Sequence, residues 1–402
     1  MDLDLIKELA DKNENKILLI ILDGLGGLPK EGGKETELEA AKTPNLDLLA
    51  ERSSCGLIDP VAPGITPGSG PGHLGVFGYD PLQHLIERGA LSCAGVNFPM
   101  EEGDVGIRIN FATKKDGKII DRRAGRMPTE QCAKLCLLLE EKISIKNVKI
   151  FIKPERDYRA AGIIRSEELS DAVSDTDPQK TGVPSLEAKA VDGTKKAVKT
   201  ARIVNEVIRL AEEILKDRYP ANTLLMRGFS LKPKIPKMQK IYGLNPLAIA
   251  VYPMYKGLAR LIGMHIIDGI EDVRSEFNVL KENFDKYDFF FFHIKPTDSA
   301  GEDGKFDEKV RVLEEVDSYI PMIDFDRYGA VAVTGDHSTP SLLKAHSWHS
   351  VPFMLYSKTC RPDRVTRFSE NDCALGNLGR MRGMELMPLL MAHAQKLKKY
   401  GA

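Results

Sequence analysis

Three apolar runs that each lead into an acidic residue constrain the fold of this chain most strongly. They lie within the segments Lys16–Asp23, Tyr287–Asp298 and Gly329–His337. Runs this continuously apolar are typical of strands that are buried on both faces of a parallel sheet. Because parallel strands share one direction, the residues that follow them collect at one carboxyl edge, where open α/β sheets bind ligands. The sequence therefore predicts an α/β fold in which Asp23, Asp298 and Asp336 converge.

Helical patterns lie between these runs, as a helix-covered parallel sheet requires. Thr43-Pro44 is a start signal, an N-cap residue followed by proline at the first helical position. The helices expected around the sheet are Asn45–Arg52, Ser275–Lys286, Phe306–Ile323 and Met384–Lys399, and a further strand is expected at Val351–Tyr356.

The chain is long enough for two domains, because 402 residues exceed what one hydrophobic core usually supports. Residues 97–239 alternate short strand patterns with helices at Thr129–Lys142 and Thr194–Lys216, and hold much of the arginine. We expect a mostly parallel α/β core made of residues 1–96 and 240–402. A smaller α+β domain, 97–239, is expected as a substrate-binding insertion in a loop of the core.

Composition excludes several classes of function. The formal net charge of −1 provides no broad field for nucleic acid or an anionic membrane. The first sixteen residues lack the apolar region of a secretory signal, and the apolar runs are too short to span a bilayer. The six cysteines form no CxxC pair, which favours a reducing cytoplasm without disulfides. A small anionic substrate would need local arginine and lysine, and the oligomeric state is left open.

Five potential metal ligands fall at or just after the carboxyl ends of the expected strands. Any one of them alone would more often be a helix cap or a turn residue. Together on rigid elements they favour a site for two hard divalent ions. The five are Asp23, Asp298, Asp336, His337 and His346.

The loop Pro67–His73 contains the candidate nucleophile, Ser69. Glycines on both sides leave its hydroxyl unshielded and let the backbone approach an anion. A helix expected to begin near Gly72 would offer free N–H groups to a phosphate. A plain Gly/Pro turn is the alternative, but a serine beside metal ligands can be activated by coordination.

Seven motifs in this order resemble those of the archaeal-type cofactor-independent phosphoglycerate mutases, members of the alkaline phosphatase superfamily. They span nearly the whole chain, so the resemblance is specific. The motifs are Ile21–Gly24, Pro67–His73, Asp121–Arg126, Ser174–Pro178, Pro253–Gly257, Lys295–Asp298 and Gly335–Thr339.

The resemblance implies an alkaline-phosphatase-like core and two divalent metal ions, whose identity (Mn²⁺, Mg²⁺, Zn²⁺ or Co²⁺) is open. It implies interconversion of 3-phosphoglycerate and 2-phosphoglycerate in glycolysis and gluconeogenesis through phosphorylated Ser69, without added 2,3-bisphosphoglycerate. By position, one metal's ligand set resembles Asp23, Ser69, Asp336 and His337. The other set resembles Asp298, residue 302 and His346.

Residue 302 departs from the family pattern, because relatives usually have histidine where this chain has Glu302. A carboxylate can bind a divalent ion and moves the preference from Zn²⁺ toward Mn²⁺ or Mg²⁺. The alternative is that one metal site is weak.

A substrate with a carboxylate and a phosphate suits bidentate arginine. Surface salt bridges are the alternative, and for Arg159 and Arg165 the two interpretations are evenly matched. The expected substrate-binding residues are Arg122, Arg123, Arg126, Arg159, Arg165, Arg227 and Lys256.

Two other functions stay open. One is a metal-dependent phosphatase or phosphotransferase that acts on another small phosphorylated substrate through Ser69. The other is a catalytically weak paralogue, which Glu302 supports. The presence of Asp23, Ser69, Asp336 and His337 together argues against it, because a cluster of like charges is costly to keep without catalysis.

Overall fold

The structure, a computed structural model, describes residues 2–401 in two compact units. Unit 1 comprises the chain up to Leu85, Pro236–Tyr252 and the chain from Ile262 onward. Unit 2 comprises Ile86–Ile235 and Pro253–Leu261. The expected insertion, 97–239, differs from unit 2 at its borders, because helix α5 (Arg88–Gly95) packs on strands of unit 2 and helix α9 (Pro253–Leu261) packs on α5.

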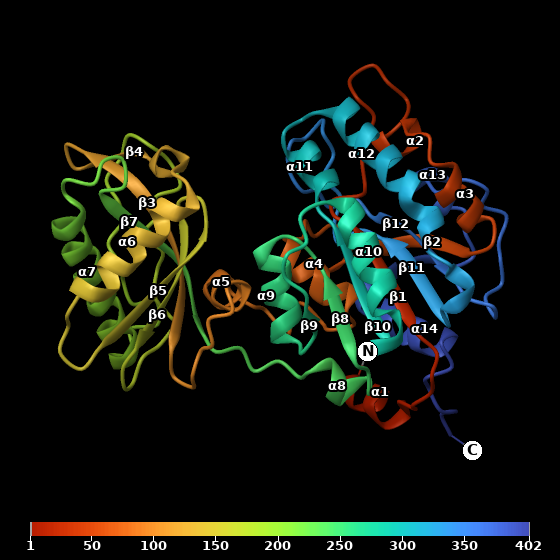
Figure 1. The fold of residues 1–402 in the computed structure, drawn as a ribbon, viewed down its shortest axis with the longest axis horizontal. Coiled ribbons are helices and arrows are strands. Elements are labelled where there is room, and N and C mark those ends of the chain that lie inside the picture. The colour runs from red at the N-terminus through yellow and green to blue at the C-terminus, as the bar shows by residue number, and fades with distance from the viewer. Residues whose placement is uncertain (1, 402) are drawn as a thin grey trace. The chain divides into compact units, whose positions relative to one another are not determined.

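Unit 1 is built on an eight-stranded sheet, in which the central strands are parallel (Figure 1). The α/β class and the mostly parallel sheet are confirmed. Val351–Tyr356 is a strand as expected, but it runs antiparallel to both of its neighbours. In spatial order the strands are β13 (Gly379–Arg382), β2 (Ser54–Asp59), β12 (Val351–Tyr356), β11 (Ala330–Thr334), β1 (Ile17–Leu22), β10 (Phe289–Ile294), β8 (Pro246–Ile249) and β9 (His265–Ile266).

Strand β1 lies at the centre of this sheet, between β10 and β11. Ile17 pairs in register with Phe289 on one side and with Ala330 on the other. Every residue of the three strands is buried, which is why their sequences are apolar without alternation. Since all three run in one direction, their carboxyl ends share one edge.

The helices of unit 1 agree with the expected ones except at their ends. The C-terminal helix was expected to reach Lys399 but ends at His393, and Gln395 has a positive φ of 56°. The helix expected to begin near Gly72 begins at Ser69 instead. The helices are α1 (Leu3–Leu9), α2 (Glu37–Ala40), α3 (Pro44–Ala50), α4 (Ser69–Val76), α8 (Met238–Ile241), α10 (Val273–Asn283), α11 (Pro296–Glu302), α12 (Phe306–Tyr319), α13 (Glu370–Cys373) and α14 (Leu386–His393).

Short 3₁₀ turns extend or precede several of these helices. The expected helices Ser275–Lys286 and Phe306–Ile323 each finish in such a turn rather than as continuous α-helix. The turns in unit 1 are η2 (Phe284–Lys286), η3 (Ile320–Met322), η4 (Phe325–Arg327) and η5 (Gly383–Glu385).

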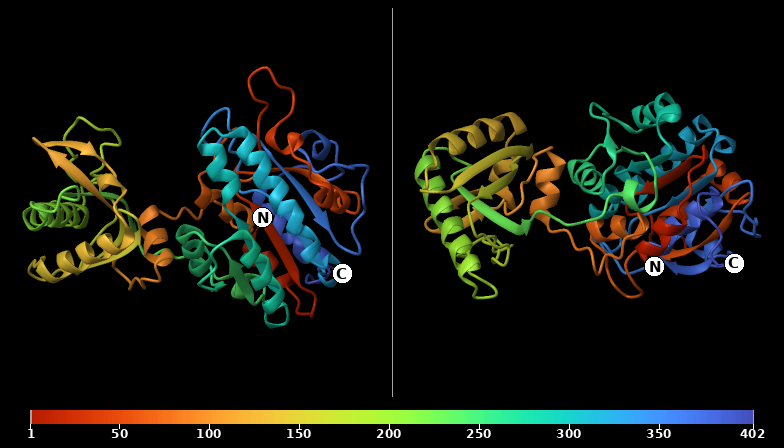
Figure 2. Two further views of the ribbon diagram at one scale, coloured as in Figure 1. Left: turned by 45° about the horizontal axis from the view of Figure 1, so that its top comes forward. Right: turned by 90° about the horizontal axis from the view of Figure 1, so that it is seen from below.

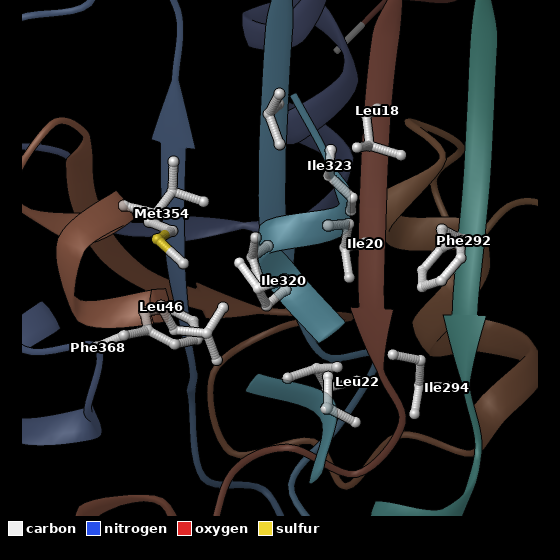
Figure 3. Packing of buried hydrophobic residues seen from close by; sticks show 14 of the residues in the cluster. Leu18, Ile20, Leu22, Leu46, Phe292, Ile294, Ile320, Ile323, Met354 and Phe368 are labelled. Atoms are coloured by element: carbon white, nitrogen blue, oxygen red, sulfur yellow. The ribbon is translucent and has the colours of Figure 1, made fainter. Parts of the chain in front are cut away.

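One face of the sheet packs on the main hydrophobic core. Helices α10 and α12 cover this face, as the two further views in Figure 2 show. The sheet contributes side chains of β1 and β10 to this core, among them Leu18, Ile20 and Phe292 (Figure 3). Helices α3, α10 and α12 supply the opposing side chains, among them Leu46 and Leu313. The alternate side chains of the same strands are left for the other face.

Unit 2 is an antiparallel sheet with two long helices on one face (Figure 1). Besides α5 and α9, its elements are β3 (Val105–Lys115), β4 (Lys118–Asp121), η1 (Ala124–Arg126), α6 (Thr129–Lys142), β5 (Lys149–Arg156), β6 (Arg159–Arg165), α7 (Lys195–Leu215) and β7 (Thr223–Leu231). Alternate residues of β3, such as Ile107 and Ile109, pack with α6 and α7 in a second core. The opposite face of β3 carries Arg108 and Asn110.

Among residues 2–401, no helix combines the length and the apolar character that crossing a membrane requires.

Candidate active site

The carboxyl edge of the central strands gathers most of the expected metal ligands. Asp23 is the first residue after β1, and Asp336 and His337 follow β11. Asp298 lies in the first turn of α11, directly after β10. His346 lies in the loop between β11 and β12. Parallel strand direction thus brings together residues that are far apart in the sequence.

Asp23, Asp336 and His337 form one potential metal-binding group. All three are fully buried, and one ligand atom from each lies within 4.8 Å of the others. His337 Nε2 is 3.1 Å from Asp336 Oδ2 and 3.4 Å from Asp23 Oδ1. Two carboxylates and one imidazole are a donor set that divalent metal ions accept.

Ser69 lies beside this group. It is the first residue of α4, and its Oγ is 3.3 Å from His337 Nε2. The helix can approach this closely because residue 72 is glycine: a Cβ there would lie 2.2 Å from the carbonyl oxygen of Asp336. Ser69 therefore presents its hydroxyl to the buried carboxylates at the N-terminus of a helix, where backbone N–H groups favour an anion.

Asp298, His337 and His346 form a second potential metal-binding group that shares His337 with the first. His346 Nε2 is 3.6 Å from Asp298 Oδ1, and the two imidazole rings stack with centroids 3.6 Å apart. Glu302 lies at the edge of this group. Its Oε1 is 3.8 Å from His346 Nε2, and its side chain is 55% exposed.

The hydrogen bonds of both histidines leave one ring nitrogen facing each group. The Thr339 hydroxyl donates its one proton to Asp298 at 2.6 Å. It must therefore accept the 2.9 Å hydrogen bond with His337, whose Nδ1–H is the donor. His346 Nδ1 likewise donates to the Pro67 carbonyl at 2.9 Å. The Nε2 lone pair of each ring then faces the carboxylates, as in histidines that bind metal.

The electrostatics of the cluster also fit cations. Burial and the nearby Asp23 together raise the pKa of Asp336 to about 6, against the opposing effect of His73. Burial also acts to raise the pKa of Asp23, but Lys295 and His293 outweigh it and hold that pKa well below its usual value. A divalent ion between the two carboxylates would relieve their repulsion.

Three further charged or ionisable residues at this site were not predicted from the sequence. His293 Nε2 and Lys295 Nζ each lie 3.2 Å from Asp23 Oδ2. Lys295 also contacts Asp298. His73 Nδ1 lies 2.8 Å from the Ser69 carbonyl oxygen and 3.0 Å from Asp336 Oδ2. The one sign in the sequence that His293 belongs to the site was a polar side chain within the otherwise apolar run 289–294.

Burial keeps two of the imidazoles neutral. It lowers the pKa of His293 to about 4 despite the opposing charge of Asp23. It lowers the pKa of His337 well below the ordinary value, with the nearby His346 and Lys295 acting in the same direction. Neutral imidazole is the form that binds metal ions.

The structure brings two of the expected substrate-binding arginines together in unit 2. Arg122 donates to both carboxylate oxygens of Asp177, at 2.8 and 2.7 Å. Arg227 Nη1 lies 3.6 Å from the same carboxylate, and its Nε lies 3.8 Å from Asp175. Within residues 2–401, nothing accepts a hydrogen bond from the buried Nε of Arg227. Arg108 pairs with Arg227 across β3 and β7, and the sequence interpretation missed it.

The other expected substrate-binding residues have different surroundings. Arg165 donates to Asp104 at 2.7 and 2.8 Å and to Glu101 at 2.6 Å, as the salt-bridge interpretation expects. Arg159 begins the same strand and lies over the Tyr158 ring. Arg123 and Arg126 are exposed near the turn η1. Lys256 lies on α9.

Comparisons of the sequence with known proteins agree on one family. The family model for 2,3-bisphosphoglycerate-independent phosphoglycerate mutase matches residues 50–222. A probable 2,3-bisphosphoglycerate-independent phosphoglycerate mutase of Thermus thermophilus is 53% identical over the full length of both chains. A protein of Aquifex aeolicus with the same printed name is 48% identical, again over the full length of both.

Two solved structures are similar to this chain over nearly its whole length. A protein from Pyrococcus horikoshii is similar with a TM-score of 0.82 and 30% identity, covering 96% of this chain and 99% of that one. A cofactor-independent phosphoglycerate mutase from Thermoplasma acidophilum is similar with a TM-score of 0.72 and 28% identity. The similarity to that protein covers 94% of this chain and 100% of the other.

Proposed function

The chain belongs to the family of 2,3-bisphosphoglycerate-independent phosphoglycerate mutases, which are isomerases, and we propose that it interconverts 3-phosphoglycerate and 2-phosphoglycerate through phosphorylated Ser69. One observation carries the proposal beyond the family name. The Ser69 hydroxyl lies at the N-terminus of α4, 3.3 Å from His337, beside two groups of buried carboxylates and imidazoles.

The two groups would hold two divalent metal ions. Asp23, Asp336 and His337, with Ser69 beside them, would hold one ion. Asp298 and His346 would hold the other, with Glu302 close enough to join them after a small movement of its exposed side chain. When bound, such ions make the serine hydroxyl more acidic and offset negative charge on the transferring phosphoryl group.

Ser69 acts twice in the proposed cycle. Its Oγ forms a bond to phosphorus and gives up its proton, while the bond from phosphorus to the substrate oxygen breaks and that oxygen takes up a proton. Glycerate stays bound and turns. Its other hydroxyl then attacks phospho-Ser69, and the serine hydroxyl is restored. The N-terminal N–H groups of α4 favour the negative charge in both steps.

Unit 2 is proposed to bind the substrate through its arginines. The buried Nε of Arg227 is a donor that no described residue satisfies, so a ligand carboxylate or phosphate can take it without displacing a protein partner. Arg122 is already held by Asp177, which orients it beside Arg227. Arginines placed in this way would retain glycerate by its carboxylate between the two transfers.

An enolase-coupled assay on 3-phosphoglycerate, with Mn²⁺ and without 2,3-bisphosphoglycerate, tests the proposal. We expect metal-dependent turnover in the wild type and a loss of about 10³-fold or more in Ser69→Ala, because the covalent route disappears. Mass spectrometry of protein quenched during turnover should find phosphate on Ser69.

The control is Ser166→Ala, which removes a hydroxyl that donates to the Asn147 carbonyl in unit 2. Its turnover should equal that of the wild type. Undiminished turnover in Ser69→Ala would reject the serine mechanism. Release of inorganic phosphate without 2-phosphoglycerate would instead identify a phosphatase.

A further inference from the structure

Lys309 is a fully buried lysine near the start of α12. Its ammonium group contacts the two loops that carry candidate metal ligands. Its Nζ donates to the carbonyl oxygens of Gly24 at 2.8 Å, Gly26 at 3.1 Å and Thr339 at 3.0 Å. An ammonium group has three N–H donors and no acceptor. Three carbonyl acceptors therefore satisfy it completely, and this geometry suits the charged form.

Removing a charged ammonium group from water costs free energy at this position. Burial lowers the pKa of Lys309, while the carboxylates of Glu37 and Glu370 act in the opposite direction. A methionine of similar length would fill the same space without that cost. Unlike methionine, the ammonium can bind the backbone carbonyl groups of two loops.

These two loops carry the candidate metal ligands. Gly24 directly follows Asp23, and Thr339 follows His337 by two residues. The Thr339 N–H donates to the Gly26 carbonyl at 3.0 Å, and its hydroxyl contacts both Asp298 and His337. A shift of the carbonyls bound by Lys309 would consequently move ligands of both groups.

Glu37 binds the same two loops through their donors. It is fully buried, and its carboxylate accepts from the N–H of Leu28 at 3.0 Å, from the N–H of Ser341 at 2.7 Å and from the Ser341 hydroxyl at 2.6 Å. Lys309 thus takes the carbonyl groups of the loops and Glu37 takes their amide groups. The two residues come from different helices, α12 and α2.

We propose that Lys309 is a positioning residue for the metal-binding groups, holding the loops after β1 and β11 at the separation that lets their side chains share a cation, with Glu37 as its counterpart. The inference rests on the proposed function, since it assumes that these groups bind divalent ions. Outer groups that orient metal ligands typically change metal affinity by about 10- to 100-fold.

The test is the full-length chain with Lys309→Met, titrated with Mn²⁺ by calorimetry and compared in thermal melts. We expect the Kd for Mn²⁺ to rise at least about tenfold. We also expect turnover at limiting Mn²⁺ to fall and to recover substantially at saturating Mn²⁺. A residue with a purely structural role would not give a loss that metal restores.

Two variants of the same helix serve as controls. Leu313→Ala empties a fully buried position of the helix and removes none of the hydrogen bonds that hold the loops. Arg311→Met removes an exposed positive charge. Both should keep the wild-type Kd for Mn²⁺ within about twofold, since a leucine side chain has no polar atom to bind the loops and Arg311 donates to the Asp307 carbonyl of its own helix. An unchanged Kd in Lys309→Met, or an equal rise in Leu313→Ala, would overturn the inference.

Glu37→Gln provides an independent test should Lys309→Met fail to fold. It keeps the shape of the side chain but places an amide NH₂ against backbone N–H groups, and it should also weaken Mn²⁺ binding. Wild-type affinity in a folded Glu37→Gln would overturn the inference. Absence of Mn²⁺ binding by the wild type would overturn the proposed metal site itself, whereas binding that neither variant alters would overturn only the positioning role.

Discussion

The candidate active site of unit 1 and the arginine cluster of unit 2 hold charge in opposite ways. Asp23, Asp336 and His337 are fully buried at the edge of a rigid sheet, with like charges close together. Arg122 and Arg227 keep 27% and 20% of their side chains exposed and already contact carboxylates. The first arrangement holds unfavourable charge in place; the second holds charge that is largely neutralised.

The two arrangements suit different tasks. Crowded, buried carboxylates cost stability and gain from a cation, so they suit a site that binds metal and acts on the transferring group. Paired arginines near water cost little and can exchange one anionic partner for another, so they suit the recognition of a substrate.

Asp23→Asn should remove the negative charge that the first metal-binding group needs most. We expect kcat/KM to fall by about 10³-fold or more and Mn²⁺ affinity to fall with it, since the amide is a far weaker ligand. Coupled assays and calorimetry measure the two quantities. Near-normal turnover with near-normal Mn²⁺ binding would show that buried charge in unit 1 serves another purpose.

Arg227→Gln should weaken substrate binding, because a charged donor with an unsatisfied buried N–H is lost. A hydrogen bond to a charged group contributes about 1.5–3 kcal/mol, so KM should rise roughly 10- to 100-fold. Arg165→Gln is the matched control in the same unit. Its partners Asp104 and Glu101 already neutralise Arg165, and its KM should change by less than about threefold. Equal effects in the two variants would contradict the assignment.

Glu276→Gln asks whether unit 1 tolerates buried charge away from the active site. Burial, with a smaller contribution from Asp272, raises the pKa of Glu276 to about 9. Since the folded pKa lies above the unfolded value near 4.5, the charge opposes folding increasingly as pH rises from 4.5 to 9. The variant should be more stable by about 1–3 kcal/mol at pH 7 and equal to wild type near pH 4.5. Urea unfolding at both pH values decides this.

Glu302→His should have the smallest effect. If the carboxylate joins Asp298 and His346 around an ion, an imidazole in its place should raise the ratio of activity with Zn²⁺ to activity with Mn²⁺ by a few-fold. Assays with each metal in turn measure this ratio. The same ratio in variant and wild type would place Glu302 outside the ligand set.

The parallel strands at the centre of unit 1 could be predicted from the sequence because one strong pattern, the continuous apolar run, encodes them. Continuous apolar runs require burial on both faces, and shared strand direction then carries the residues after them to one edge. Asp23 and Asp336 meet for that reason alone. The position of Ser69 at the first residue of α4 did not follow, because a Gly-Ser-Gly-Pro stretch allows a turn or a helix start equally.

Other parts of the site depend on register and long-range contacts that no local pattern encodes. His293 contacts Asp23 only because β10 pairs with β1. Arg165 and Arg227 were both expected to bind substrate, yet Arg165 pairs closely with Asp104 and Glu101, whereas the carboxylates nearest Arg227 lie 3.6 and 3.8 Å away. The C-terminal helix kept its amphipathic pattern beyond His393, but the buried Lys396 donates to the Asn13 carbonyl and directs the chain elsewhere.

The position of α9 in the sequence complicates any attempt to express the two units separately. It is encoded between β8 and β9 of unit 1, yet it packs with α5 and is assigned to unit 2. Excising residues 86–235 would remove α5 and expose the face of α9 around Gly257, which now lies against Leu91 and Gly95. A trimmed core should therefore aggregate unless α9 is removed as well or its apolar positions are redesigned as polar ones.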